Sequence, residues 1–231
     1  MVQVNTTPIT LRVKFCKVGN LQYISHLDLV RTMMKVIVRA KLPLWYTEGF
    51  NPKPKLVFAA PLSIGTESQC EFMDIRLTEK MNPKDAINAL NANMTLQMQA
   101  IDAYYPDTKL TTLRWLSYDI NLNTFGASEE LAAKCQEALN ADTLPILKKT
   151  KSGEAIVDIK PLVKSAEVKF EDGRISAKCV LSADASAFLN PEYVVKLLRE
   201  KCGVLSSGDL VNENYTIMRT GAYCENMTEF R

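Results

Sequence analysis

The first half of the chain alternates between extended and helical hydrophobic patterns. Residues 12–18 alternate charged and apolar side chains, which is the period of a half-buried strand, and a Gly-Asn pair ends the run. Ser25 and Asp28 then form a capping-box-like helix start, and Pro43 forbids continuation. We therefore predict an amphipathic helix over residues 26–41. The apolar side chains expected to face the sheet are Leu27, Val30, Met34, Ile37 and Val38.

Short apolar runs separated by turn-forming residues follow this helix. The Asn82-Pro83 pair supplies a helix cap and a first-turn proline, and the helix it begins is expected to end at Asn93. The predicted order is strand, helix, strands, helix, strand. The strands predicted after the first helix are Leu44–Thr47, Lys55–Ala60, Cys70–Leu77 and Leu96–Tyr104.

The second half of the chain repeats this order. Asn190-Pro191 falls 108 residues after Asn82-Pro83, and the helix expected from Ser128 begins 103 residues after Ser25. An internal duplication of a βαββαβ unit explains both offsets. The elements predicted here are strand Leu113–Leu122, helix Ser128–Asn140, hairpins within Ile146–Ser182, helix Pro191–Cys202 and strand Asn214–Thr220.

These elements predict an α+β protein made of tandem ferredoxin-like domains. Each βαββαβ unit would pack its two helices on one face of an antiparallel sheet. The polar stretch 106–112 separates the halves, so we expect domains at residues 1–108 and 109–231. The pattern leaves open whether the extra extended run after each first helix is an insertion or part of a long bent hairpin.

The composition is that of a soluble globular protein. The 231 residues are 47% hydrophobic, and no stretch reaches the roughly 18 consecutive apolar residues of a membrane span. The first residues lack the features of an export signal, so we expect a cytoplasmic protein without membrane contact. Six cysteines without a CxxC pair favour reduced thiols over a disulfide-linked partner, and a single histidine argues against a metal site. We expect no cofactor.

The charge is strongly polarised along the chain. Residues 1–55 hold nine Lys or Arg against two acids, a balance of +7, whereas the other 19 bases and 24 acids sum to −5. This asymmetry predicts an anionic partner for the N-terminal part. On the first helix, Arg31, Lys35 and Arg39 are spaced four apart and form one basic stripe. The stripe fits phosphate binding or a solvated helix face.

The loop after this helix combines rigidity with aromatic and basic side chains. Gly49 is free to adopt positive φ, while Asn51 and Pro52 favour a fixed turn. Trp45, Tyr46 and Phe50 lie beside Lys53 and Lys55 in the sequence, a grouping that suits stacking of unpaired bases with phosphate contacts. A rigid hairpin tip with no ligand is the structural alternative.

His26 is the one candidate catalytic residue. In the first helical turn, the helix dipole favours a neutral imidazole, which could act as a general base near phosphate groups. The alternative is a hydrogen-bonding residue at the helix start, beside the capping Ser25. The usual signatures of nucleotide-dependent, zinc-protease and serine-hydrolase chemistry are absent from the sequence.

Four motifs of the N-terminal part resemble a bacterial family of unknown function described as radical SAM-linked. They are Ser25-His26-Leu27-Asp28, the helix end Arg39-Ala40, Tyr46–Pro52 and Leu62–Gly65, and the resemblance extends over about residues 11–80. Members of that family occur beside radical-SAM, cobalamin-type proteins or fused to them. The resemblance therefore implies a radical-SAM enzyme as partner. The chain has no CxxxCxxC motif, so the radical chemistry is not expected to be its own.

A weaker similarity, at the level of fold, links the chain to CRISPR-repeat-processing endoribonucleases, which are tandem ferredoxin-like proteins. Many of them use a helix-borne histidine without metal, but their glycine-rich C-terminal loop is missing here.

Three functions are consistent with these patterns. The first is a non-catalytic RNA-binding accessory protein that works with a radical-SAM enzyme in RNA or ribosome-related modification. The second is a metal-independent endoribonuclease that uses His26. The third is a module that docks on the radical-SAM enzyme without RNA contact. We expect the protein not to be an enzyme itself.

Overall fold

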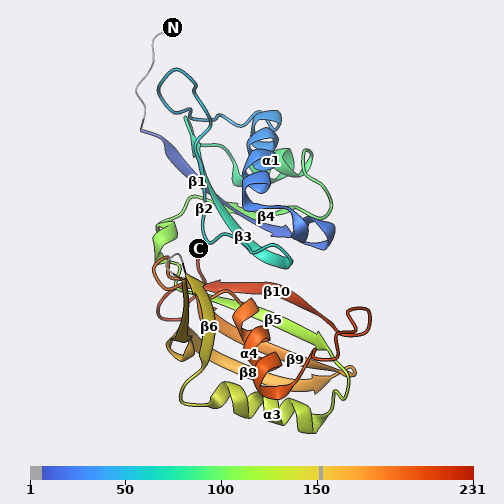
Figure 1. Ribbon diagram of the computed structural model, residues 1–231. Helices are drawn as coiled ribbons and strands as arrows, with labels where there is room; N and C mark the ends of the chain where they lie inside the picture. The colour runs from blue at the N-terminus through green and yellow to red at the C-terminus, as the bar shows by residue number, and fades with distance from the viewer. Residues whose placement is uncertain (1–6, 151–152) are drawn as a thin grey trace. The chain divides into compact units, whose positions relative to one another are not determined.

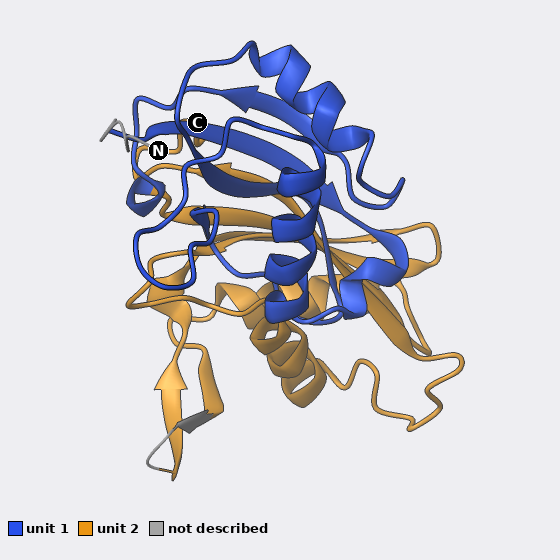
Figure 2. Cartoon of the chain, turned by 90° about the horizontal axis from the view of Figure 1, so that it is seen from above, with its two compact units in different colours: residues 1–112, 231 blue, residues 113–230 orange. Residues whose placement is uncertain are grey.

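The computed structural model describes residues 7–150 and 153–231. The chain forms two compact units, the first of residues 1–112 with Arg231 and the second of residues 113–230 (Figure 2). Each unit is α+β, with helices packed on an antiparallel sheet. Among the described residues, no helix combines the length and the apolar character that crossing a bilayer requires.

Unit 1 contains one four-stranded antiparallel sheet in the order β4-β1-β3-β2 (Figure 1). The chain visits a strand, a helix, two strands, a helix and a final strand, as the sequence pattern predicts. Short 3-10 turns lie at Gly19–Tyr23 and Leu110–Thr112. The elements are β1 (Ile9–Lys17), α1 (His26–Arg39), β2 (Leu56–Phe58), β3 (Thr66–Leu77), α2 (Pro83–Asn91) and β4 (Ala100–Tyr104).

Unit 2 follows the same order, with one hairpin added. Its antiparallel sheet runs β10-β5-β9-β8, while β6 and β7 pair only with each other. The extra extended run of this half is therefore a separate hairpin. The elements are β5 (Trp115–Asn123), α3 (Glu129–Asn140), β6 (Pro145–Thr150), β7 (Gly153–Asp158), a 3-10 turn (Lys160–Leu162), β8 (Val163–Glu171), β9 (Arg174–Ser182), α4 (Glu192–Cys202) and β10 (Asn214–Tyr223).

The predicted strand Leu44–Thr47 is wrong. Only two isolated bridges form there, between Leu44 and Leu77 and between Tyr46 and Pro54. The chain turns back after Thr47, because the Thr47 N–H donates to the Lys53 carbonyl at 2.9 Å. The apolar run is too short to form a ladder before that turn.

The buried face of α1 differs from the predicted one. The buried side chains are Leu29, Met33, Val36 and Ile37, so only Ile37 of the predicted set is fully buried. Leu27 and Val38 are 56% and 47% exposed. Apolar residues surround most of this helix, and their spacing alone does not determine which sector meets the sheet.

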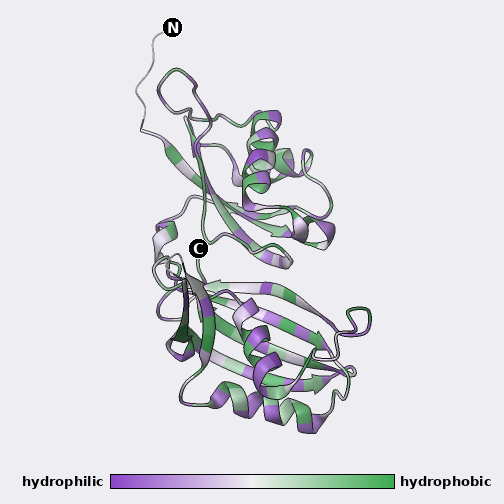
Figure 3. Ribbon diagram, in the orientation of Figure 1, coloured by the Kyte–Doolittle hydropathy of each residue, from purple (hydrophilic) through white to green (hydrophobic). Residues whose placement is uncertain are grey.

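Both helices of unit 1 cover the same face of its sheet. Alternate residues of β1 and β3 are buried in this layer, and the helices supply its other side. Hydrophobic and hydrophilic residues alternate along the ribbon of the strands and helices (Figure 3). The opposite face, which carries the remaining residues of β1 and β3, is called here the helix-free face. The buried core residues are Leu11, Val13 and Phe15 of β1, Met73, Ile75 and Leu77 of β3, the four buried residues of α1, Ala86 and Leu90 of α2, Ala100 and Ala103 of β4, and Leu42 and Met98 outside these elements.

The core of unit 2 is built in the same way and includes buried thiols. Alternate residues of β5 and β9 face α3 and α4, among them Cys179. All six cysteines are free thiols, and burial raises the pKa of both Cys135 and Cys179 to about 12. These thiols are therefore protonated at neutral pH and act as core residues.

A buried ion pair lies on the helix-free face of unit 1. Arg12 is 0% exposed and donates to both carboxylate oxygens of Asp74, from Nε at 2.7 Å and from Nη2 at 3.0 Å. The guanidinium also donates to the Thr108 hydroxyl at 3.1 Å and to the Thr108 carbonyl at 3.0 Å. One side chain thus joins β1, β3 and the segment that follows β4.

Removing one charge of this pair should strongly destabilise the protein. We expect Asp74→Asn to lower the free energy of unfolding by about 3–5 kcal/mol, because the buried Arg12 guanidinium loses the carboxylate that accepts two of its hydrogen bonds. Urea unfolding measures the loss. Glu167→Gln is the control: Glu167 and Lys169 also approach to 2.7 Å, but both are exposed. A denaturation midpoint that falls equally in both variants would contradict this role.

A carboxylate also organises the loop before β10. Glu213 accepts hydrogen bonds from the Thr124 hydroxyl at 2.6 Å, the Phe125 N–H at 3.1 Å and the Ser207 N–H at 2.7 Å. The hydrogen bonds from Ser207 and Thr124 lower the pKa of Glu213 to about 2. The ionised carboxylate therefore joins the loop at Ser207 to the turn after β5.

This lowered pKa predicts a pH-dependent effect of Glu213→Gln. The carboxylate stabilises the fold above the ordinary glutamate pKa of 4.5, and this stabilisation is lost as the pH falls toward about 2. The variant should thus be clearly less stable than the native chain near neutral pH, with the difference shrinking through this range. Thermal unfolding at a series of pH values measures this difference in stability. Glu137→Gln, at an exposed position of α3, is the control. A difference that is constant with pH would contradict the prediction.

Candidate nucleic-acid interface

The two arms of the loop between α1 and β2 meet at Arg76 of β3. The Trp45 N–H donates to the Arg76 carbonyl at 2.9 Å, and the Arg76 N–H donates to the Lys55 carbonyl at 3.0 Å. The two arms also bond to each other, from the Lys55 N–H to the Trp45 carbonyl at 3.3 Å. Both arms of the loop are thus held by the backbone of Arg76.

The tip of this loop is closed and presents an aromatic side chain to solvent. The Thr47 N–H donates to the Lys53 carbonyl, and the Lys53 N–H returns a bond to the Thr47 hydroxyl at 3.1 Å. Phe50 lies between them with a relative exposure of 112%, and Tyr46 is 44% exposed. Lys53 and Lys55 are exposed as well. A closed five-residue tip therefore displays an aromatic ring close in sequence to two ammonium groups.

Gly49 is required by the backbone of this tip. Its φ is +120°, a backbone conformation that residues with a side chain rarely adopt, although an added Cβ would meet no atom within 4 Å. Asn51 and Pro52 complete the exposed turn. Conformation, and not lack of space, accounts for glycine here.

The basic stripe of α1 is exposed, as its spacing predicts. Arg31, Lys35 and Arg39 all face solvent, and within the described part of the chain only Arg31 of the three forms an ion pair, a loose one with Asp28 at 3.4 Å. Arg39 ends the helix, and five residues later Leu44 bridges β3 at Leu77. Arg39 therefore lies toward the end of the sheet that carries the loop, whereas Arg31 lies about 12 Å back along the helix axis.

His26 lies at the other end of α1 and packs against β2. Its ring meets Phe58 edge to face, with centroids 5.4 Å apart and an interplanar angle of 82°. Its Nδ1 is buried and has no hydrogen-bond partner among the described residues. Ser25 caps the helix by accepting from the Asp28 N–H at 3.2 Å, and its hydroxyl donates to the Asp28 carboxylate at 2.7 Å. This geometry is typical of a packed and capped helix start.

No candidate metal site is evident in the part of the chain that the structure describes. Residues 7–150 and 153–231 contain no group of three or more His, Cys, Asp or Glu side chains placed to hold an ion. Phosphate groups near the loop or helix would be met by lysine and arginine instead.

A pocket on the helix-free face of unit 1 was not predicted from the sequence. It encloses about 470 Å³ between the sheet and the segment after β4. Arg76 lines its wall from β3, and Lys109 lines it from the opposite segment. Arg76 lies in an alternating strand and Lys109 in a polar connection, and neither context gives a local signal of a site. Only the Arg12–Thr108 contact brings the two walls together.

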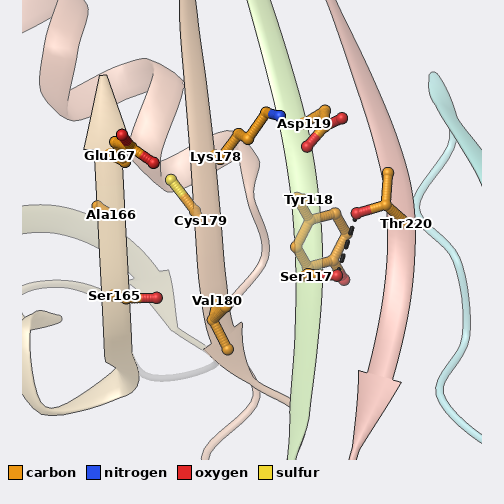
Figure 4. Close-up of a pocket in the computed structure, with 10 residues that line it drawn as sticks. All are labelled: Ser117, Tyr118, Asp119, Ser165, Ala166, Glu167, Lys178, Cys179, Val180 and Thr220. Atoms are coloured by element: carbon orange, nitrogen blue, oxygen red, sulfur yellow. Dashed lines mark hydrogen bonds between the residues drawn. The ribbon is translucent and has the colours of Figure 1, made fainter. Parts of the chain in front are cut away.

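Unit 2 has a pocket of about 440 Å³ on its own sheet (Figure 4). Lys178 of β9 is paired in register with Glu167 of β8 and Asp119 of β5, so its charge faces a carboxylate on each side. Beside them the Ser117 and Thr220 hydroxyls share a hydrogen bond of 3.0 Å. The charges of this surface are balanced among its own side chains, as on an ordinary polar face of a sheet.

Comparison with protein families identifies the family of the chain. Residues 10–191 match the family described as "Uncharacterized protein conserved in bacteria (DUF2344)". The chain belongs to the DUF2344 family. The match includes α1, the loop after it and the unit 1 pocket. It also includes every residue that lines the unit 2 pocket except Thr220. No curated protein matches this DUF2344 chain.

Solved structures offer distant similarities to this DUF2344 chain. A chain of a "Cbf5-Nop10-Gar1 Complex" is 10% identical with a TM-score of 0.49, and the alignment covers 92% of this chain but 48% of that one. The DUF2344 chain thus spans about half its length. An unknown protein from Galdieria sulphuraria is 9% identical at a TM-score of 0.28, covering 92% of this chain and 99% of that one. DyPB from Rhodococcus jostii RHA1 is 9% identical at 0.22, covering 93% and 92%. Similarity at this level does not identify a shared function.

Substitution of Gly49 should open the loop tip. A β-branched side chain at this φ costs about 1–3 kcal/mol, so Gly49→Val should speed hydrogen exchange of the Thr47 and Lys53 amides by about 5- to 150-fold. Hydrogen exchange followed by NMR measures the effect. Asn51→Ala, in the same exposed tip, is the control and should leave both rates unchanged. Equal rates in Gly49→Val and the native chain would show that closure does not depend on glycine.

Proposed function

We propose that the chain is a non-catalytic RNA-binding accessory protein whose unit 1 holds single-stranded RNA. The observation that carries the proposal is the closed loop tip, which presents a fully exposed Phe50 in the most basic part of the chain. In this proposal Phe50 and Tyr46 stack on unpaired bases. Lys53, Lys55 and the α1 stripe of Arg31, Lys35 and Arg39 bind the phosphates.

The physical chemistry of the loop supports this role. A large aromatic side chain in water forfeits the burial that usually stabilises it, so full exposure on a closed turn favours a partner that covers it. Stacking of one base on an aromatic ring contributes about 1–3 kcal/mol without sequence preference. The backbone bonds that close the tip also hold it ready for binding, which reduces the entropy lost when RNA is ordered against it.

The proposed partner is inferred from the resemblance of the N-terminal motifs to radical SAM-linked proteins. We propose that the chain works in the cytoplasm with a radical-SAM enzyme, in RNA or ribosome-related modification, and that the chemistry belongs to that enzyme. The chain has six cysteines but no CxxxCxxC, the motif that would hold a radical-SAM cluster.

We also propose that the two units are ferredoxin-like domains that arose by internal duplication. The support is their strand order. When the strands of each main sheet are numbered in chain order, leaving out β6 and β7, β4-β1-β3-β2 and β10-β5-β9-β8 both read fourth, first, third, second. In both units one helix follows the first strand and the other follows the third. In this proposal the β6–β7 hairpin is an insertion in the second copy.

RNA binding and its dependence on the loop provide the test. Fluorescence anisotropy of the full chain with single-stranded RNA should show binding that weakens with salt. Phe50→Ala should weaken binding by about 1–3 kcal/mol, because stacking is lost. Lys53→Glu/Lys55→Glu should also weaken it and reduce the salt slope by about 0.7 per lost phosphate contact.

Matched variants separate these effects from general changes in charge or stability. Phe125→Ala removes an exposed aromatic of unit 2, and Lys80→Glu/Lys84→Glu reverses two exposed charges of unit 1 away from the loop and the α1 stripe. Both should bind RNA as the native chain does. Salt-independent binding, or equal losses in loop and control variants, would overturn the proposal.

The alternatives give different outcomes of the same experiment. RNA cleavage without metal that His26→Ala abolishes would make the protein an endoribonuclease. Absence of RNA binding, together with a complex between this chain and the co-expressed radical-SAM protein on size-exclusion chromatography, would make unit 1 a protein-docking module. Absence of that complex despite RNA binding would remove the enzyme partner from the proposal.

A further inference from the structure

The pocket on the helix-free face of unit 1 combines a charged wall with apolar surface. Thr10, Asp74 and Arg76 line it from β1 and β3, while Val57 of β2 is 43% exposed beside them. Leu110 contributes apolar surface from the segment after β4. Its volume of about 470 Å³ falls in the range of small-molecule sites, roughly 300–1,000 Å³.

The charged residues that line this pocket are Asp74, Arg76, Asp107 and Lys109. Asp74 is compensated by Arg12, which binds both of its carboxylate oxygens. Across residues 7–150 and 153–231, the Arg76 guanidinium and the Lys109 ammonium form no ion pair. The two cations outnumber Asp107, the one remaining carboxylate of the lining, and this positive excess favours an anion between them.

The pocket of unit 2 provides an internal comparison. There the single cation, Lys178, faces Glu167 and Asp119 in adjacent strands (Figure 4). That surface has no unbalanced positive charge with which to bind a phosphate. Of these two pockets, the one with an excess of positive charge therefore lies in the unit that also carries the loop.

Arg76 connects the pocket of unit 1 to the loop. Its side chain lines the pocket, and its backbone bonds to Trp45 and Lys55 at the base of the two loop arms. Leu56 packs into the core, so the preceding Lys55 points to the helix-free face, as Arg76 does. A strand of RNA that stacks on Phe50 thus has a row of cations leading from the loop to the pocket.

We infer that this pocket binds one phosphorylated nucleotide of the RNA. The phosphate lies between Arg76 and Lys109, and the base lies against Val57 and Leu110. The inference deepens the proposed function, since it names a second, enclosed subsite for the same ligand. It adds Arg76 and Lys109 to the residues that contact RNA.

Mononucleotides test the pocket separately from the loop. We would titrate the labelled full chain with AMP, UMP, GMP and CMP, and with adenosine and inorganic phosphate, and follow amide shifts by NMR. At least one nucleotide should shift the amides of Val57, Arg76 and Lys109 and bind at least tenfold more tightly than adenosine or phosphate. Arg76→Gln/Lys109→Gln should weaken this binding at least tenfold, whereas Lys80→Gln/Lys84→Gln should leave it unchanged.

The outcomes distinguish the pocket from the proposed function. Mononucleotide binding that persists in a chain unable to bind RNA would leave the pocket assignment standing and remove the RNA-binding role. RNA binding by the loop that is unaffected by Arg76→Gln/Lys109→Gln would remove the pocket alone. Inorganic phosphate that binds as tightly as the nucleotides, or no shift at Val57, would overturn the nucleotide assignment. An unchanged denaturation midpoint for the double variant shows that any loss is not caused by unfolding.

Discussion

The buried pair of Arg12 and Asp74 is the constraint on which the shape of unit 1 depends. The two residues are 62 positions apart, and each buried charge is stabilised by the other. Because the same guanidinium also bonds Thr108, the segment after β4 is fixed over the helix-free face of the sheet. That segment forms one wall of the unit 1 pocket, so a single electrostatic requirement creates both the closed face and the cavity within it.

The order of elements could be predicted because their boundaries are encoded locally. Asn82 and Ser128 cap α2 and α3 as their positions predict, accepting from the N–H groups of Lys84 and Leu131. Alternation likewise identifies β1 and β5. The face of α1 could not be predicted, since apolar residues lie on most of its circumference and the choice of face depends on the sheet. The predicted strand at 44–47 is wrong because the turn closed between Thr47 and Lys53 ends the extended run after a few residues.

The candidate site also contains residues that the sequence could identify and residues that it could not. The residues of the loop could be selected from sequence because glycine, proline, aromatic and basic residues occur together within ten positions. Arg76 and Lys109 could not, because each is a single charge in an ordinary context. They become neighbours of one cavity only through contacts that span 62 and 96 positions. Long-range packing, which a local pattern does not contain, thus determines the pocket part of the surface that we assign to RNA.

The closed form of the loop tip has a kinetic consequence. A segment that is already folded does not have to rearrange after encounter, so association should be governed by diffusion and by the field of the basic residues. The exposed ring makes contact only once the partner is in place, and its contribution therefore belongs to the lifetime of the complex. The basic residues would determine the rate at which unit 1 associates with RNA, and Phe50 would determine the rate at which the complex dissociates.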